Sequence, residues 1–193
     1  MVAERGEGCW LWDVDGNCYL DLTAGLAVSI LGYAHPAVLE AIRKQSEQLI
    51  HFSAADFYYP HYALLAERLA KLAPGNEPKK VFLCNSGTES IEAALKLARY
   101  HTKRHRCVAF LNAFHGRTVG ALALTSSRPN QQRGFGPMLG GVTHIPFSME
   151  GLDYLENTLF RTNLPPEEVA AVVAEPIQAE GGCHVPRPDF LPR

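Results

Sequence analysis

Short apolar runs alternate with helix-like segments over most of this chain, and this alternation limits the folds open to it. Each run is bounded by polar or turn residues, which is typical of a buried strand. The predicted strands are Val81–Cys84, Cys107–Leu111, Val142–Ile145 and Val169–Ala174. Helical patterns lie between them at Ile91–Tyr100 and at about Gly151–Phe160. The pattern predicts an α/β fold with right-handed crossovers, a mainly parallel sheet and helices on both faces.

The N-terminal part has a different pattern. Trp10–Asp21 predicts a β-hairpin, because Asp-Gly favours a tight turn between two apolar-rich arms. Thr23–Leu31 is small and apolar, which predicts a buried irregular stretch. Two amphipathic helices are expected next, at Pro36–Ile50 and His61–Leu72. The second should turn four leucines inward, namely Leu64, Leu65, Leu69 and Leu72.

Composition excludes several classes of protein. With 193 residues and a net charge of −2, the chain suits a globular fold and gives no case for nucleic acid or an acidic membrane surface. No apolar run approaches the length of a membrane span, and the first residues show no secretory signal. The 5 cysteines are scattered and unpaired in sequence. This usage indicates reduced thiols and a cytoplasmic location.

The stretch Asn85–Ser90 is a predicted turn from strand to helix. Gly87 permits a sharp turn and a close approach by a ligand. Free amides and the helix dipole favour an anion at such a terminus, most simply a phosphate. The hydroxyls of Ser86 and Thr88 would add donors to the site, or one of them would instead cap the helix. The turn taken alone leaves both interpretations open.

Polar loops also follow two other predicted strands, and ligands bind at the carboxyl ends of strands in open α/β sheets. After Leu111 come Phe114 and Arg117, which suit stacking on a planar ring and clamping a carboxylate. Core packing and a surface charge are the alternatives for this pair. After Ala174 come Glu175 and Glu180, which would contact a ligand or an arginine, or else remain solvated.

Other candidate sites carry less weight. His101 and His105 share a helical spacing, but no third ligand is near them in the sequence, so no metal site is predicted. No phosphate-binding P-loop, dinucleotide-binding glycine motif or nucleophile-elbow motif is present. The aromatic segment Ser53–Pro60 is expected to be either a packed loop or a substrate-facing one.

Taken together, these motifs resemble the class III pyridoxal-phosphate-dependent aminotransferases, which include 4-aminobutyrate, ornithine and acetylornithine aminotransferases. They follow the family's order and cover nearly the whole chain. The matching stretches are Leu11–Gly16, Tyr19–Asp21, Gly32–Pro36, Asn85–Ser90, Ala93–Arg99, Ala113–Thr118 and Ala174–Gly182. Asp56–Pro60 looks most like the 4-aminobutyrate-type subgroup, which also contains amino-acid racemases.

The resemblance implies a fold type I architecture with an incomplete large domain. Residues 1–52 would be the hairpin-and-helix segment, part of the small domain, and residues 53–193 the start of the cofactor-binding large domain. The implied cofactor is pyridoxal 5′-phosphate. The implied partners are a small-molecule amino donor, a keto acid acceptor and a second copy of the full-length chain in a homodimer.

Roles for the cofactor are implied residue by residue. Gly87 and Thr88 match positions that hold the cofactor phosphate, and Ser86 directly precedes them. Phe114 matches the aromatic residue that stacks on the pyridine ring. Glu175 matches a glutamate near the catalytic aspartate. His115 is assigned to the surroundings of the cofactor without a defined role.

Three further residues are implied to face the substrate. Leu26 matches an aliphatic residue of the pocket, and Arg117 matches an arginine that grips the distal end of the substrate. Glu180 matches a glutamate that shields a carboxylate-binding arginine. This set suits an ω-amino acid such as 4-aminobutyrate, with 2-oxoglutarate as acceptor.

No lysine in the chain matches the family's cofactor-anchoring lysine. That lysine and the aspartate on the pyridine nitrogen are expected beyond Arg193, so no catalytic residue is assigned within the chain. The expectation is an N-terminal fragment that is inactive alone. A racemase of the same family and a non-catalytic module that binds a phosphorylated ligand are the alternatives.

Overall fold

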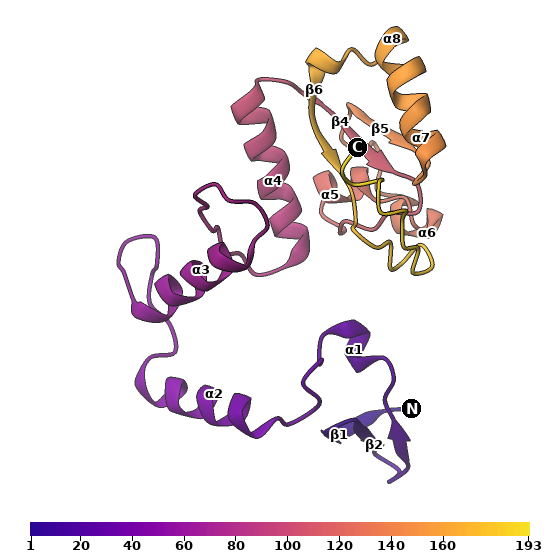
Figure 1. The fold of residues 1–193 in the computed structure, drawn as a ribbon. Helices are drawn as coiled ribbons and strands as arrows, with labels where there is room; N and C mark the ends of the chain where they lie inside the picture. Colours follow the sequence, from indigo (N-terminus) through magenta and orange to yellow (C-terminus); the bar gives the residue numbers. More distant parts are fainter. The chain divides into compact units, whose positions relative to one another are not determined.

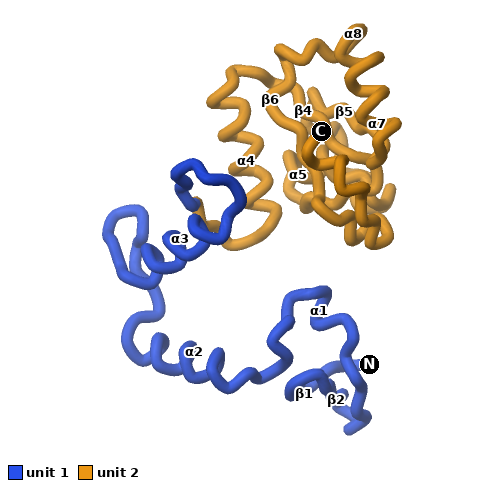
Figure 2. Tube along the Cα trace, viewed as in Figure 1, with its two compact units in different colours: residues 1–81 blue, residues 82–193 orange.

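The computed structural model describes residues 1–193, which divide into two compact units, Met1–Val81 and Phe82–Arg193 (Figures 1 and 2). The N-terminal unit contains β1 (Ala3–Glu7), β2 (Trp10–Asp13), β3 (Cys18–Leu20), α1 (Ala24–Ala27), α2 (Pro36–Gln48) and α3 (Pro60–Leu72). No helix of the chain is long and apolar enough to cross a membrane.

The C-terminal unit follows an α/β order. Its elements are α4 (Gly87–Thr102), β4 (Arg106–Phe110), α5 (Val119–Leu124), α6 (Pro129–Gln132), β5 (Val142–Ile145), α7 (Met149–Tyr154), a π-helical turn (Leu155–Leu159), α8 (Phe160–Thr162), a 3₁₀ turn (Pro166–Glu168) and β6 (Val169–Val173). The helix expected at about Gly151–Phe160 therefore exists but runs through a π-helical turn.

The sheet of the C-terminal unit is parallel, with β4 between β5 and β6. Successive residues of β4 point to opposite faces. Val108 and Phe110 join a core with Leu155 and Leu159, whereas Cys107 and Ala109 join a second core with the α4 residue Leu95 and with α5. Helices therefore cover both faces of the sheet, which confirms the predicted fold class.

The predicted strand Val81–Cys84 is wrong for this chain, because the segment pairs with no strand. Phe82 is 73% exposed. A short apolar run predicts burial only when a neighbouring strand accepts its hydrogen bonds, and the three-stranded sheet offers none to this segment.

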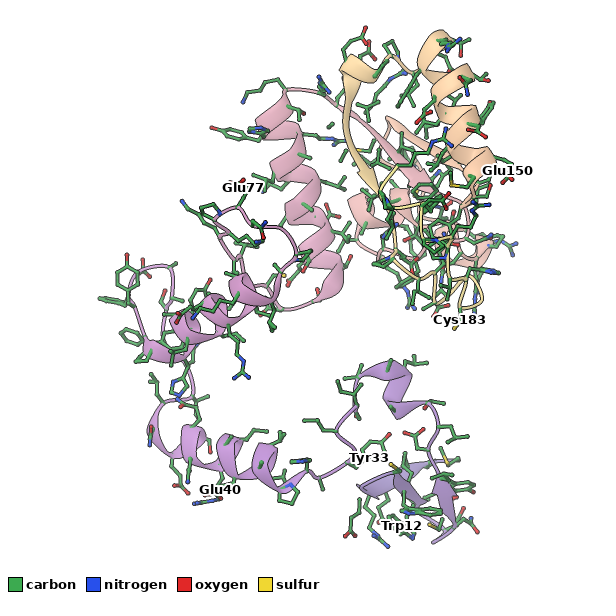
Figure 3. All side chains as sticks on the ribbon, in the orientation of Figure 1. Trp12, Tyr33, Glu40, Glu77, Glu150 and Cys183 are labelled. Carbon is green, nitrogen blue, oxygen red and sulfur yellow. The ribbon has the colours of Figure 1, made fainter.

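The predicted hairpin is confirmed. Strands β2 and β3 pair antiparallel around the Asp15-Gly16 turn, and β1 adds a third strand beside β2. Asp13 is buried at the turn, where its carboxylate accepts hydrogen bonds from Asn17 and from the hydroxyl of Tyr19. The ring of Tyr33 packs against Gly6 of β1, where a Cβ would overlap it. Tyr33 and Trp12 are labelled in Figure 3.

The two helices predicted in the N-terminal unit form as α2 and α3, but their apolar faces are not buried. Helix α3 contains no buried residue, and its leucines are exposed, Leu72 to 74%. The expected burial of Thr23–Leu31 is also wrong: Leu26 and Ile30 are 83% and 80% exposed. An amphipathic pattern indicates which face of a helix can pack, but burial also needs an opposing surface. The N-terminal unit contains no such surface for these residues.

Candidate functional site

The first turn of α4 has free hydrogen-bond donors. Ser86 is the N-cap, and its hydroxyl accepts a hydrogen bond from the Glu89 backbone N at 3.3 Å. Glu89 in turn accepts from the Asn85 N at 2.5 Å. The amides of Gly87 and Thr88 have no acceptor within the chain, and the space beside Gly87 is open. The structure shows the capping role for Ser86, which uses its oxygen as an acceptor and leaves its hydroxyl hydrogen and two amides for an anion.

The loop after β4 lies against this turn. Thr88 Oγ1 and Thr118 Oγ1 are 2.7 Å apart, and the Thr118 N donates to Thr88 Oγ1 at 3.3 Å. Gly116 has φ of 126°, and a Cβ there would overlap the Thr88 side chain. Only glycine satisfies both the conformation and the close approach.

The loop after β6 holds the other end of the same segment. The Glu175 carboxylate accepts from the Phe114 N at 2.7 Å and from the Ala179 N at 3.2 Å. Gln178 is buried, and its amide donates to the Leu111 carbonyl at 2.9 Å. Three segments that are distant in sequence therefore meet at the carboxyl ends of β4 and β6, which is the convergence expected of a ligand site.

Phe114 and Arg117 are neighbours in space. The Arg117 guanidinium lies 5.8 Å from the centre of the Phe114 ring, within the range of a cation–π contact. Phe114 is half-buried and Arg117 is exposed. Neither residue belongs to the cores of the unit, so the core-packing alternative for Phe114 does not hold.

His115 is buried beside this segment, with a ring Nε2 that has no hydrogen-bond partner. Its backbone N donates to Thr125 Oγ1 at 2.9 Å, and that hydroxyl donates to the Gly116 carbonyl at 3.0 Å. Burial lowers the pKa of His115, and the nearby His144 lowers it further, although Glu175 opposes both. The imidazole is therefore neutral at neutral pH.

Two predicted site residues, Glu180 and Leu26, take no part in these hydrogen bonds. Glu180 is exposed and pairs with Arg128 at 3.3 Å. Leu26 belongs to the N-terminal unit and has a left-handed backbone, with φ of 62°. The described chain contains no group of three or more His, Cys, Asp or Glu side chains that could hold a metal ion.

Sequence reasoning missed the residues that hold the site together. Glu92 on α4 accepts hydrogen bonds from the Thr118 hydroxyl and from two amides of α5, and Thr125 bridges His115 and Gly116. One sequence signal was available, because Glu92 follows Thr88 by one helical turn and shares its face. Thr125 gave no signal, since its partners depend on how the loop folds back.

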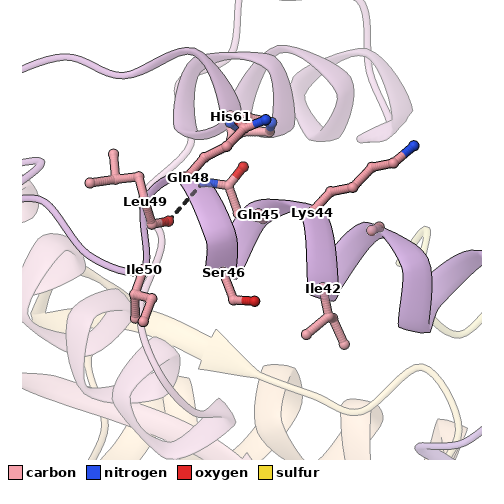
Figure 4. Close-up of a pocket in the computed structure, with 9 residues that line it drawn as sticks. Ile42, Lys44, Gln45, Ser46, Gln48, Leu49, Ile50 and His61 are labelled. Carbon is pink, nitrogen blue, oxygen red and sulfur yellow. Dashed lines mark hydrogen bonds between the residues drawn. The ribbon is translucent and has the colours of Figure 1, made fainter.

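One cavity lies within the N-terminal unit. It measures about 710 Å³ and runs along α2 to His61 in the N-terminal unit (Figure 4). Beside it the Gln45 amide donates to the Leu49 carbonyl at 2.8 Å. The cavity contains none of the predicted site residues and no cluster of catalytic groups. We place the candidate site at the meeting of α4, β4 and β6, where the polar segments converge.

Comparison with known proteins identifies the family of this chain. The family model for class III aminotransferases matches residues 1–193, so the chain belongs to the class III aminotransferase family. It is 42% identical to an acetylornithine aminotransferase of Methanopyrus kandleri and 39% identical to a probable 4-aminobutyrate aminotransferase of Bacillus subtilis. These matches cover 96% and 98% of this chain but 45% and 47% of the relatives. The chain thus spans about half the length of the relatives it matches.

A solved structure supports the fold. The (S)-enantioselective ω-transaminase of Thermomicrobium roseum superposes with a TM-score of 0.89 at 33% identity. The match covers 100% of this chain and 47% of that one. The chain thus has the fold of the matching portion of a fold type I aminotransferase, with a parallel α/β sheet preceded by an antiparallel N-terminal sheet. Pyridoxal phosphate is the cofactor of this family.

Proposed function

We propose that this chain supplies the phosphate cradle and ring contact of an aminotransferase that converts an ω-amino acid such as 4-aminobutyrate, with a keto acid such as 2-oxoglutarate as acceptor. One observation carries the proposal: hydrogen bonds join the open first turn of α4 to the segment that bears Phe114 and Arg117. Family membership supports pyridoxal phosphate as the cofactor. A relative named as a probable 4-aminobutyrate aminotransferase supports a substrate whose amine is far from its carboxylate.

The residues present fit pyridoxal phosphate. Two unused amides, Gly87 N and Thr88 N, lie at the positive end of a helix of 16 residues, and the space beside Gly87 is open. Phe114 offers a ring that is not part of the core. A phosphate on the amides and a flat ring beside Phe114 are the two contacts such a ligand needs. When bound, the cofactor supplies an electron sink for the substrate's reacting carbon.

Each residue of the chain has a physical task in this proposal. The amides of Gly87 and Thr88 bind the phosphate, and Ser86 keeps the turn open by capping the helix. Glu175 holds the backbone of Phe114 and so fixes the position from which its ring extends. Arg117 presents a guanidinium that binds a carboxylate with two hydrogen bonds. His115 is proposed to act through packing, since burial keeps its imidazole neutral.

The proton-transfer base and the partner of the pyridine nitrogen are proposed to lie outside residues 1–193. The whole enzyme is further proposed to be a cytoplasmic homodimer, with Leu26 and Glu180 at the substrate end of the site. The chain of 193 residues alone should therefore show no amino transfer from 4-aminobutyrate or ornithine to 2-oxoglutarate. Measurable turnover by the purified chain would contradict the proposal that the proton-transfer base lies outside residues 1–193.

Replacing Arg117 tests the substrate class in the complete enzyme. Arg117→Ala should weaken use of 4-aminobutyrate by roughly 1.5–3 kcal/mol, the scale of a hydrogen bond to a charged group. A simple alkylamine without a carboxylate is the matched control and should be nearly unaffected. Equal losses for both donors would show that Arg117 does not bind the substrate. Racemisation of an amino acid without any keto acid would favour the racemase alternative.

A further inference from the structure

A chain of hydrogen bonds joins the first two turns of α4 to the loop after β4. The Thr118 hydroxyl donates to Glu92 Oε1 at 2.6 Å, and Thr88 Oγ1 lies 2.7 Å from Thr118 Oγ1. The same Glu92 oxygen accepts from the backbone N of Gly120 at 2.8 Å and of Ala121 at 3.1 Å. Glu92 is therefore the end point of the network.

The direction of these hydrogen bonds follows from the chemistry of the Glu92 carboxylate at which they end. An ionised carboxylate only accepts hydrogen bonds, so the single hydroxyl hydrogen of Thr118 is committed to Glu92. Between the two threonines, Thr88 must then be the donor. Its own oxygen accepts from the Thr118 N at 3.3 Å. The Thr88 hydroxyl therefore has no hydrogen left for a ligand, which leaves the amides of Gly87 and Thr88 and the hydroxyl hydrogen of Ser86 as the donors of this turn.

Glu92 is ionised at neutral pH. Burial raises the pKa of its carboxyl, but the hydrogen bonds from Thr118, Ala121 and Gly120 and the charge of Arg99 outweigh it, so the pKa lies below its usual value. The fit is also close, because a Cβ on Gly120 would overlap the Glu92 carboxylate. The network thus has a charged anchor with little room to move.

We propose that Glu92 is a positioning residue for the cofactor: it fixes the direction of the Thr88–Thr118 hydroxyl chain and clamps the loop that bears Phe114 and Arg117 onto the anion-binding end of α4. This inference rests on the proposed function. It assigns to Glu92 a task that requires no contact with the ligand. The clamp sets the distance between the phosphate amides and the ring of Phe114.

The clamp has a consequence for binding. A phosphorylated pyridine must contact the α4 amides and Phe114 together, so its affinity depends on how firmly the two segments are joined. Inorganic phosphate needs only the amides. A weakened clamp should therefore reduce binding of the first ligand and leave binding of the second unchanged.

Thr118→Val tests this, because valine keeps the shape and removes the hydroxyl. The probes are pyridoxine 5′-phosphate, which has no aldehyde to react with lysines, and inorganic phosphate, both titrated into the 193-residue chain by calorimetry. We expect about a tenfold loss for pyridoxine phosphate, the scale of a hydrogen bond to a charged group. Inorganic phosphate should stay within about twofold of the wild type.

Two controls separate positioning from folding. Thr118→Ser restores the hydroxyl and should restore the affinity for pyridoxine phosphate. Thr162→Val removes an equivalent hydroxyl from exposed α8, where it donates to the Thr158 carbonyl, and should change neither affinity. Unchanged affinity in Thr118→Val, a failure of serine to rescue, or equal losses for both probes would each overturn the proposal.

A second readout does not need a ligand. The pKa of the Glu92 carboxyl, followed by ¹³C NMR, should rise in Thr118→Val and stay at the wild-type value in Thr118→Ser. An unchanged pKa in Thr118→Val would show that the hydroxyl does not donate to Glu92, and would overturn the proposal. If the wild-type chain binds neither probe while this pKa behaves as expected, the proposed function fails and the hydroxyl direction stands.

Discussion

The two units of this chain carry similar amphipathic sequences but bury them to very different extents. All buried apolar residues lie between Leu95 and Phe190, in the C-terminal unit. In the N-terminal unit neither α2 nor α3 has a buried residue. The C-terminal unit has a sheet whose two faces each meet a helix, whereas the N-terminal helices have no opposing layer within their own unit. A periodic apolar face thus determines which side of a helix can pack, and the rest of the fold determines whether it does.

Hydrogen exchange should show the largest difference between the units. Amides of β4 lie in the middle of a sheet covered on both faces, so they should exchange only when the C-terminal unit unfolds. Amides of α2 and α3 should exchange about a thousandfold faster, or more, because little buried area protects them. Mass spectrometry of peptic fragments measures both in one experiment. Equal protection in the two units would contradict the comparison.

The second-largest difference is expected between two leucine substitutions, one in each unit, in their effect on the free energy of unfolding. Leu124 is fully buried, so Leu124→Ala should lower the free energy of unfolding of the C-terminal unit by about 2–5 kcal/mol. Leu64 is 60% exposed, so Leu64→Ala should change stability by about 0.5 kcal/mol or less. Urea titration followed by circular dichroism measures both. A large loss from Leu64→Ala would show that the apolar face of α3 is packed in solution.

Two glycines with positive φ separate conformational strain from a steric clash. Gly16 has φ of 82° and open space around its missing Cβ, so Gly16→Ala should cost about 1–2 kcal/mol through the backbone alone. Gly116→Ala should cost more, since its Cβ would also overlap Thr88. Thermal unfolding of the two variants gives the order. A smaller effect at Gly116 would mean that the loop after β4 does not lie against α4.

Acid should affect the N-terminal unit through Asp21. Hydrogen bonds from the Tyr33 hydroxyl and from Thr23 lower the pKa of this carboxyl to about 2. A lowered pKa means that the contribution to stability is complete above the unfolded value of 3.8 and is lost as the pH falls towards 2. Tyr33→Phe should move this loss to higher pH. Fluorescence of Trp10 and Trp12 reports it selectively, because both tryptophans are in this unit.

The sequence predicted the elements better than their surroundings. The three paired strands of the C-terminal unit and the hairpin could be predicted because period and turn chemistry are local properties. The strand at Val81–Cys84 and the burial of Thr23–Leu31 could not, because pairing and burial depend on a second surface that a local pattern does not contain. Burial of an apolar run is therefore the least safe part of such a prediction.

The candidate site shows the same division. Gly87, Phe114 and Glu175 were found because they follow apolar runs in a chain with an α/β pattern, and the structure brings their segments together. Glu92 and Thr125 were missed, since their partners lie 26 to 29 and 9 to 10 residues away in the sequence. The candidate ligand-binding residues lie in local motifs, whereas the contacts that hold these motifs together become visible only in three dimensions.

The most direct test of the proposed cofactor site follows the amides of the α4 turn by NMR while ligand is added. Pyridoxine 5′-phosphate should shift the amide signals of Gly87 and Thr88, and pyridoxine without the phosphate should leave them unchanged. This result is predicted because both amides lack an acceptor within the chain and lie at the positive end of α4. Shifts confined to other residues, or equal shifts with the two ligands, would contradict a phosphate cradle at this turn.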